Sequence, residues 1–238
     1  EHAEAFAREL HRIHADDLVS VVLYGSAARG QYRAGRSDLN LLVVLRQVDP
    51  PALRRTTDAA RAWVAAGNAP PLLLGEGDLR RSVDVFPIEY ADIREAHRVL
   101  YGTDPFAGVE IDAEHLRLQC EHELKAKQIA LREHYLLRAD DPAQLGELLL
   151  GSISTFLVLF RTVLRLAGEP VPGEPKALVE AIARLAGFDA APLHAVLDAR
   201  SGAAEELRPD ADAPAAVGYL AAVERVVAWV DRLSDRVA

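Results

Sequence analysis

The stretch of residues 18–45 constrains the fold of this chain more than any other. Two apolar runs, residues 18–24 and residues 41–45, are rich in Val and Leu, and a polar segment that opens with Gly25 and Ser26 separates them. Short apolar runs bounded by turn residues are typical of buried β-strands. We therefore expect a strand, a tight turn that opens a short helix, and a second strand.

The polar segment carries groups that suit an anion. Gly25 lets the backbone approach a ligand closely because it has no Cβ, and free N–H groups at the start of a helix face outward. Ser26 adds a hydroxyl, and Arg29 adds a cation suited to phosphate oxygens. Alternation along the second strand predicts that Asp38 and Asn40 share one face and point toward the Gly-Ser turn.

These residues form a recognisable pattern. Residues 25–30 (GSAARG) followed by residues 37–43 (SDLNLLV) resemble the GSxxRG…SDxDLLV signature of the polymerase-β-like nucleotidyltransferase superfamily, and among its members the small bacterial aminoglycoside and kanamycin nucleotidyltransferases. The resemblance implies that Gly25, Ser26 and Arg29 bind the triphosphate of an NTP and that paired acids bind magnesium. Asn40 stands where the family has its second Asp. An Asn can ligate a metal through its amide oxygen but brings no charge, which bears on two-metal catalysis rather than on the fold.

The resemblance also implies a third carboxylate from a later strand. Residues 83–90 are expected to form that strand, and Pro87 within it suggests an edge or a bulge. Periodicity alone does not orient the acids of this segment. We assign the third carboxylate to Glu89 on the resemblance, with Asp84 and Asp92 as alternatives.

The remaining patterns divide the chain in two. We expect a nucleotidyltransferase domain over residues 1–101 and a helical bundle over residues 112–238, which makes an α+β fold: a mixed sheet with helices, followed by an all-α bundle. In the first domain, the elements expected besides those above are helices over 2–16, 50–66, 78–82 and 93–100 and a short strand over 70–74. In the second, Gly, Pro and Asp-rich breaks delimit helices over 112–138, 142–167, 175–186, 190–199 and 214–236.

One basic residue of the bundle is a further candidate. Lys127 lies beside the core-facing stripe of the helix expected over residues 112–138. In enzymes of the resembled family the helical domain closes over the nucleotide and lends a basic side chain to the triphosphate, and we assign that role to Lys127. The alternative is an exposed Lys paired with Glu123.

The amino-acid composition and net charge argue against several classes of protein. A formal net charge of −9 argues against a nucleic-acid acceptor, because phosphate-backbone binding needs a basic face. A single Cys excludes an internal disulfide and fits a reducing cytoplasm. We expect no membrane span and no signal peptide, and hence a cytoplasmic protein. The sequence contains no Met, so we expect the encoded protein to begin upstream of Glu1.

The patterns together predict a nucleotidyltransferase that moves a nucleoside monophosphate from an NTP to a hydroxyl of a small acceptor and releases pyrophosphate. Asp38, Asn40 and Glu89 would bind Mg²⁺ or Mn²⁺, and Glu89 is also the candidate general base. Two alternatives stay open: an inactive nucleotide- or ligand-binding regulatory protein, for which Asn40 is the best argument, and an enzyme that nucleotidylates a protein, as antitoxins of this kind do. A homodimer or a protein partner is compatible with each.

Overall fold

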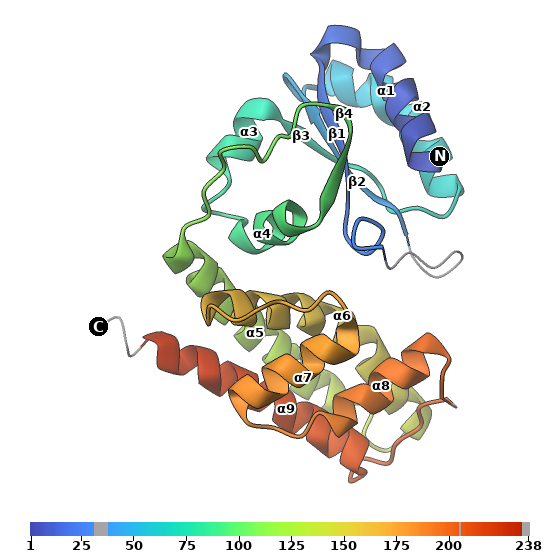
Figure 1. Ribbon diagram of the computed structural model, residues 1–238. Helices are drawn as coiled ribbons and strands as arrows, with labels where there is room; N and C mark the ends of the chain where they lie inside the picture. The colour runs from blue at the N-terminus through green and yellow to red at the C-terminus, as the bar shows by residue number, and fades with distance from the viewer. Residues whose placement is uncertain (31–37, 205, 235–238) are drawn as a thin grey trace. The chain divides into compact units, whose positions relative to one another are not determined.

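The computed structural model describes residues 1–30, 38–204 and 206–234 (Figure 1). It contains two compact units, Glu1–Asp112 and Ala113–Ala238. Residues 102–111, which lie between the two domains expected from the sequence, belong to the first unit. Ser37, part of the sequence signature, lies outside the described residues. Each unit is considered by itself.

The first unit is built on a mixed four-stranded sheet, as the sequence predicts. Its strands are β1 (Leu18–Tyr24), β2 (Asn40–Leu45), β3 (Leu72–Gly75) and β4 (His97–Gly102). They lie in the order β3-β2-β1-β4, with β1 antiparallel to both β2 and β4 and with β3 parallel to β2. The two parts of the sequence signature therefore adjoin the same end of the central strand pair. Tyr24 at the end of β1 lies opposite Asn40 at the start of β2.

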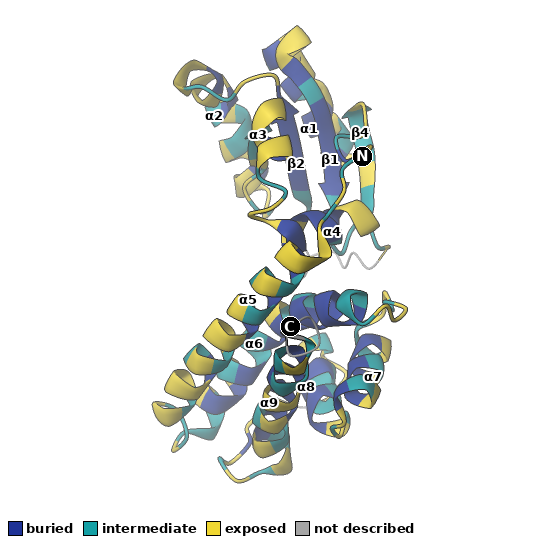
Figure 2. Cartoon of the chain, turned by 90° about the vertical axis from the view of Figure 1, so that its left-hand side faces the viewer, coloured by how far each residue is buried: buried dark blue, intermediate teal, exposed yellow. Residues whose placement is uncertain are grey.

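Both faces of the sheet are covered, which explains why its central strands are continuous apolar runs. On one face, side chains such as Val43 pack with α1 (His2–His14) and α2 (Pro50–Ala65). On the other face, side chains such as Leu42 pack with α3 (Glu76–Arg81) and α4 (Pro87–Glu95). A single 3₁₀ turn, Ala15–Asp17, leads from α1 into β1. Figure 2 shows the two central strands as buried along almost their whole length.

The segment from residue 83 to residue 102 differs from the sequence prediction. Residues 83–90 are not a strand, because Pro87 starts α4, where its fixed φ and missing N–H suit the first turn. The helix expected over residues 93–100 ends at Glu95, and β4 follows it. Pairing of β4 with β1, for example Tyr24 with His97 and Val22 with Val99, brings these residues into the sheet. Such a long-range contact has no local sequence signal.

The described part of the second unit is helical throughout. It contains α5 (Ala113–Leu136), α6 (Pro142–Leu166), α7 (Pro175–Ala186), α8 (Ala191–Ser201) and α9 (Pro214–Ser234). Two of the helix starts have side-chain caps: Asp141 accepts hydrogen bonds from backbone N–H groups of α6, and Glu174 accepts one from α7. These boundaries follow the sequence pattern within two residues, because caps, prolines and apolar spacing all act locally.

Helix α6 is the core of this unit. Its 25 residues are long and apolar enough to cross a membrane by length and composition alone. More than half of its apolar window, 56%, is buried inside the protein. Its fully buried side chains include Leu149, Ile153 and Phe160. The apolar composition of α6 therefore matches its position as a core helix.

Candidate functional site

The Gly-Ser turn lies at the end of the central strand β1. Gly25 has φ of 79°, a conformation that side chains other than Gly rarely adopt. The Arg29 N–H donates to the Gly25 carbonyl at 3.1 Å and the Gly30 N–H donates to the Ala27 carbonyl at 3.3 Å. Residues 25–30 therefore form consecutive turns, and the helix expected to open here is not formed over these residues.

This turn leaves a set of donors available. The N–H groups of Ser26, Ala27 and Ala28 make no hydrogen bond to another residue of the described chain. Successive N–H groups in a turn form a concave surface that binds anions. The turn can thus supply the donors that the sequence analysis attributed to a helix start, together with the Ser26 hydroxyl.

Asn40 adjoins this turn directly. A Cβ built on Gly25 would lie 3.1 Å from Asn40 Nδ2, so the positive φ favours Gly at residue 25 and the space for a side chain there is tight. Asn40 is opposite Tyr24 in the ladder, and strand alternation puts it on the same face as Leu42, which is the face that α4 covers. Burial raises the pKa of Tyr24, so this neighbour of Asn40 stays a neutral phenol.

Asp38 precedes Asn40 by two residues and is exposed. Between them Leu39 packs into the cluster on the α1 and α2 face. The Leu39 N–H donates to Asn68 Oδ1 at 3.4 Å, and Asn68 Nδ2 donates to the Trp63 carbonyl. Asn68 thereby anchors the approach to β2, a role that the sequence analysis does not identify because the contact joins residues 29 positions apart.

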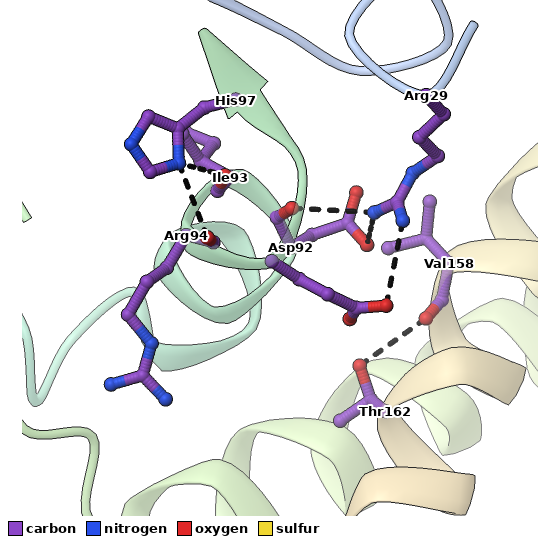
Figure 3. A network of polar contacts seen from close by, with 8 residues as sticks. Arg29, Asp92, Ile93, Arg94, His97, Val158 and Thr162 are labelled. Atoms are coloured by element: carbon purple, nitrogen blue, oxygen red, sulfur yellow. Dashed lines mark hydrogen bonds and ion pairs between the residues drawn. The ribbon is translucent and has the colours of Figure 1, made fainter. Parts of the chain in front are cut away.

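Arg29 makes several polar contacts within the described part of the first unit. Its Nη2 lies 2.8 Å from Asp92 Oδ1 and 3.3 Å from the Asp92 main-chain carbonyl, and its Nη1 lies 3.5 Å from Glu95 Oε1 (Figure 3). The Arg29 side chain is only 8% exposed. Both acids belong to α4. The sequence analysis considered Asp92 only as a metal ligand and missed Glu95, because it expected no helix end at this point.

The candidates for the third carboxylate have different surroundings. Glu89 lies in the first turn of α4 and is exposed, so the strand on which the assignment was based does not exist. Asp84 is exposed in the turn that precedes α4. Asp92 is the ion-pair partner of Arg29.

Among the described residues, few side-chain oxygen atoms are available as metal ligands at this site. No group of three His, Cys, Asp or Glu side chains that could hold a metal ion occurs within residues 1–30, 38–204 and 206–234. Asp38 and Asn40 offer one carboxylate and one amide oxygen. Mg²⁺ is commonly bound by one or two carboxylates together with substrate phosphate oxygens, so this donor set fits Mg²⁺ that arrives with a nucleotide.

Lys127 lies on α5 in the second unit. Its Nζ is 3.7 Å from Glu123 Oε2, and its side chain is 47% exposed. This is the pairing named as the alternative in the sequence analysis. The buried face of α5 is formed by neighbours such as Cys120, Leu124 and Leu131.

Comparisons with known proteins are informative at the level of structure. No known family model matches the sequence, and no curated protein is similar to it at a significant level. The structure is similar to that of spectinomycin adenyltransferase AAD(9) from Enterococcus faecialis, which was solved with ATP and spectinomycin. The TM-score is 0.58 at 11% identity, and the match covers 94% of this chain and 98% of that one.

Two further similarities are weak. A toxin–antitoxin structure with AMP-PNP matches with a TM-score of 0.32 at 18% identity, over 56% of this chain and 98% of that one. The tri-AMPylated Shewanella oneidensis HEPN toxin in complex with MNT antitoxin matches with a TM-score of 0.29 at 17% identity, over 56% and 96%. Neither supports an inference at these scores. The AAD(9) comparison shows the fold: this chain shares the fold of that adenyltransferase, a mixed sheet with helices followed by a helical region.

Proposed function

We propose that this protein is a nucleotidyltransferase, which transfers a nucleoside monophosphate from an NTP to a hydroxyl of a small acceptor and releases pyrophosphate. The observation that carries the proposal is the proximity of Gly25 and Asn40, whose side-chain Nδ2 would lie 3.1 Å from a Cβ built on Gly25. On a nucleotidyltransferase fold, it joins the two halves of the sequence signature at the end of the central strands. AAD(9), which shares the fold, was solved with ATP and a small molecule.

The Gly25 turn is assigned to the triphosphate. The N–H groups of Ser26, Ala27 and Ala28 and the Ser26 hydroxyl are oriented donors. Donors that are already in place stabilise negative charge as it develops on a leaving group, without reorganisation during the reaction. These groups would therefore bind the β- and γ-phosphates, which leave as pyrophosphate.

Asp38 and Asn40 are assigned to the metal. They would hold Mg²⁺ or Mn²⁺ together with phosphate oxygens, and the bound ion supplies Lewis-acid polarisation of the α-phosphate. Glu89, exposed in the first turn of α4, is assigned as third carboxylate and as general base that accepts the proton of the acceptor hydroxyl. The sequence resemblance alone assigns Lys127 to the triphosphate, and in the structure its Nζ lies 3.7 Å from Glu123 Oε2.

Asn40 favours a second candidate function. Replacing one acid of a three-acid site by an amide removes a full charge from the group that must balance the cation. A nucleotide-binding regulatory protein on the same fold needs the Gly25 turn but not the full set of acids. Only the enzyme should release pyrophosphate, whereas both kinds of protein should bind a nucleotide.

Thermal unfolding with each of the four NTPs, with Mg²⁺ or Mn²⁺, tests nucleotide binding. At a ligand concentration of about 100 times Kd, binding should stabilise the protein by on the order of 2.7 kcal/mol. Ser26→Ala should reduce this gain, and Thr57→Ala, which removes a hydroxyl from α2 in the same unit, should leave it unchanged. No shift with any NTP would overturn both candidate functions.

A further inference from the structure

We propose that Arg29 is a positioning residue, which fixes the Gly25 turn to α4 and does not contact the triphosphate. The inference deepens the proposed function and rests on it. It replaces the phosphate-binding role that the sequence resemblance implies for this Arg.

The guanidinium of Arg29 makes three contacts with one turn of α4. Asp92 and Glu95 are three residues apart and so lie on the same side of the helix, and Arg29 reaches both with its two terminal nitrogens, at 2.8 Å and 3.5 Å. A third contact goes to the Asp92 main-chain carbonyl. Figure 3 shows Arg29 extending from the turn to Asp92 on α4. The planar fork of Arg suits such a multiple contact, and Lys could not reproduce it.

The burial of this cluster opposes phosphate binding by Arg29. The Arg29 side chain is only 8% exposed, and the side chains of Asp92 and Glu95 are 19% and 33% exposed. To reach a phosphate, the guanidinium would have to give up its charge-assisted contacts with both carboxylates, and breaking a largely buried ion pair is unfavourable. The cluster is therefore stable as an internal contact.

Arg29 also connects this cluster to the donors of the turn. Its N–H closes the turn on the Gly25 carbonyl, so its backbone orients the N–H groups of Ser26 to Ala28, which precede it. Ala27 packs on the opposite face of the sheet, with the α1 and α2 cluster. The turn is thus held from both faces of the sheet, by Ala27 on one and by Arg29 on the other.

Helix α4 is a rigid support for this contact. Tyr90 and Ile93 are almost fully buried against the sheet. The same helix carries Glu89, the proposed general base. The Arg29 contact therefore fixes the triphosphate turn and the proposed base in one frame, and loosening it should displace both groups relative to the nucleotide.

The two roles of Arg29 predict opposite effects of Asp92→Asn. If Arg29 positions the turn, Asp92→Asn and Arg29→Ala should each weaken MgATP binding, by about 10-fold for the loss of a charge-assisted contact. The double variant should bind MgATP no more weakly than the weaker-binding single variant, because the two substitutions remove the same contact. If Arg29 binds phosphate, Asp92→Asn should tighten MgATP binding, because it releases the guanidinium.

The measurement is calorimetric titration of the full chain with MgATP, well below the unfolding temperature. The matched control is the exposed ion pair of Arg12 with Glu9 on α1, where Arg12→Ala and Glu9→Gln should not change the affinity. Arg29→Lys replaces Arg29→Ala if the latter does not fold, and should weaken binding because Lys lacks the fork. Unchanged affinity with a lowered unfolding temperature would show a purely structural contact and overturn the inference.

MgATP binding by the wild-type protein distinguishes a failure of this inference from a failure of the proposed function. Wild-type protein that binds MgATP, together with tighter binding by Asp92→Asn or additive losses in the double variant, overturns the role of Arg29 alone. Wild-type protein that binds no MgATP overturns the proposed function and this inference with it.

Discussion

The secondary structure of the two units agrees to different degrees with the prediction from the sequence. In the second unit, α7 (Pro175–Ala186) has the bounds that the sequence predicts, because Pro175, the Glu174 cap and the left-handed Gly187 after its end are all local signals. In the first unit, the segment from residue 83 to residue 102 has helix where strand was expected and strand where helix was expected. The comparison shows that local signals determine a bundle, whereas sheet pairing can override them.

Both units bury polar side chains beside their apolar cores. The core of the second unit is dominated by large apolar side chains such as Phe160, but it also buries Arg161 and Thr162. The first unit buries the His14 ring and nearly all of the Arg29 side chain. Burial lowers the pKa of His14, so the stability of the first unit should depend on pH.

We expect the largest effect on stability from replacing one glycine by alanine in each unit. A Cβ on Gly102, which has φ of 76°, would lie 1.9 Å from the Val19 carbonyl oxygen, and a Cβ on Gly146 would lie 1.8 Å from the Leu207 carbonyl oxygen. Backbone atoms must move to relieve either clash. We expect Gly102→Ala to destabilise the first unit and Gly146→Ala the second, each by about 3 kcal/mol.

Two probes distinguish the units in this experiment. Trp63 is buried in the first unit and reports its unfolding by fluorescence in a Trp229→Phe background. Cys120 is buried in the second unit, and burial raises the pKa of its thiol to about 12, so it should react with thiol reagents only when that unit opens. Equal shifts of both probes in both variants would mean that the units unfold as one, and the comparison would fail.

A smaller, pH-dependent effect is expected from His14 in the first unit. Thr56 donates its hydroxyl hydrogen to the Ala52 carbonyl, so it accepts from His14 Nε2–H at 2.9 Å. His14 Nδ1 is buried and has no hydrogen-bond partner in the described chain. Burial, and to a lesser extent Arg55, lowers the pKa of His14. The folded unit therefore holds the neutral imidazole.

The sign of the pH dependence follows from this shift. The unfolded chain takes up a proton at His14 below a pKa of about 6.5, whereas the folded unit does so only at lower pH. The contribution of His14 is fully present above pH of about 6.5 and is lost as the pH falls toward the folded pKa. His14→Gln should flatten the dependence of the unfolding free energy on pH below a pH of about 6.5. An unchanged slope in the variant would contradict the neutral assignment.

The smallest effect is a stabilisation. Gly151 lies in the interior of α6, is exposed, and has no atom within 4 Å of an added Cβ. Gly151→Ala should stabilise the second unit by up to about 1 kcal/mol, because Ala loses less conformational freedom in a helix. Denaturant unfolding followed by Cys120 reactivity measures it. A loss of stability would show that α6 is not a simple helix at this position.

The central strands, the mixed sheet and the helical second unit could be predicted from the sequence, because continuous apolar runs, caps and breaks are local. The proximity of Gly25 to Asn40 could also be predicted, since antiparallel pairing across a turn brings their strand ends together. The sequence predicts Glu89 on a strand that does not form, because Pro87 starts a helix instead of marking a strand bulge. The engagement of Arg29 by Asp92 and Glu95 joins residues 63 and 66 positions apart, for which a single sequence contains no signal.

The central claim is that Asp38 and Asn40 hold the catalytic metal of a nucleotidyltransferase. Its most direct test is pyrophosphate release by wild type, Asn40→Asp and Asp38→Ala at equal NTP and Mg²⁺ concentrations, with a screen of hydroxyl-bearing acceptors. We expect release by the wild type, faster release by Asn40→Asp because a charged ligand binds the ion more tightly, and a loss on the order of 100-fold in Asp38→Ala. Release that persists at the wild-type rate in Asp38→Ala would contradict the claim.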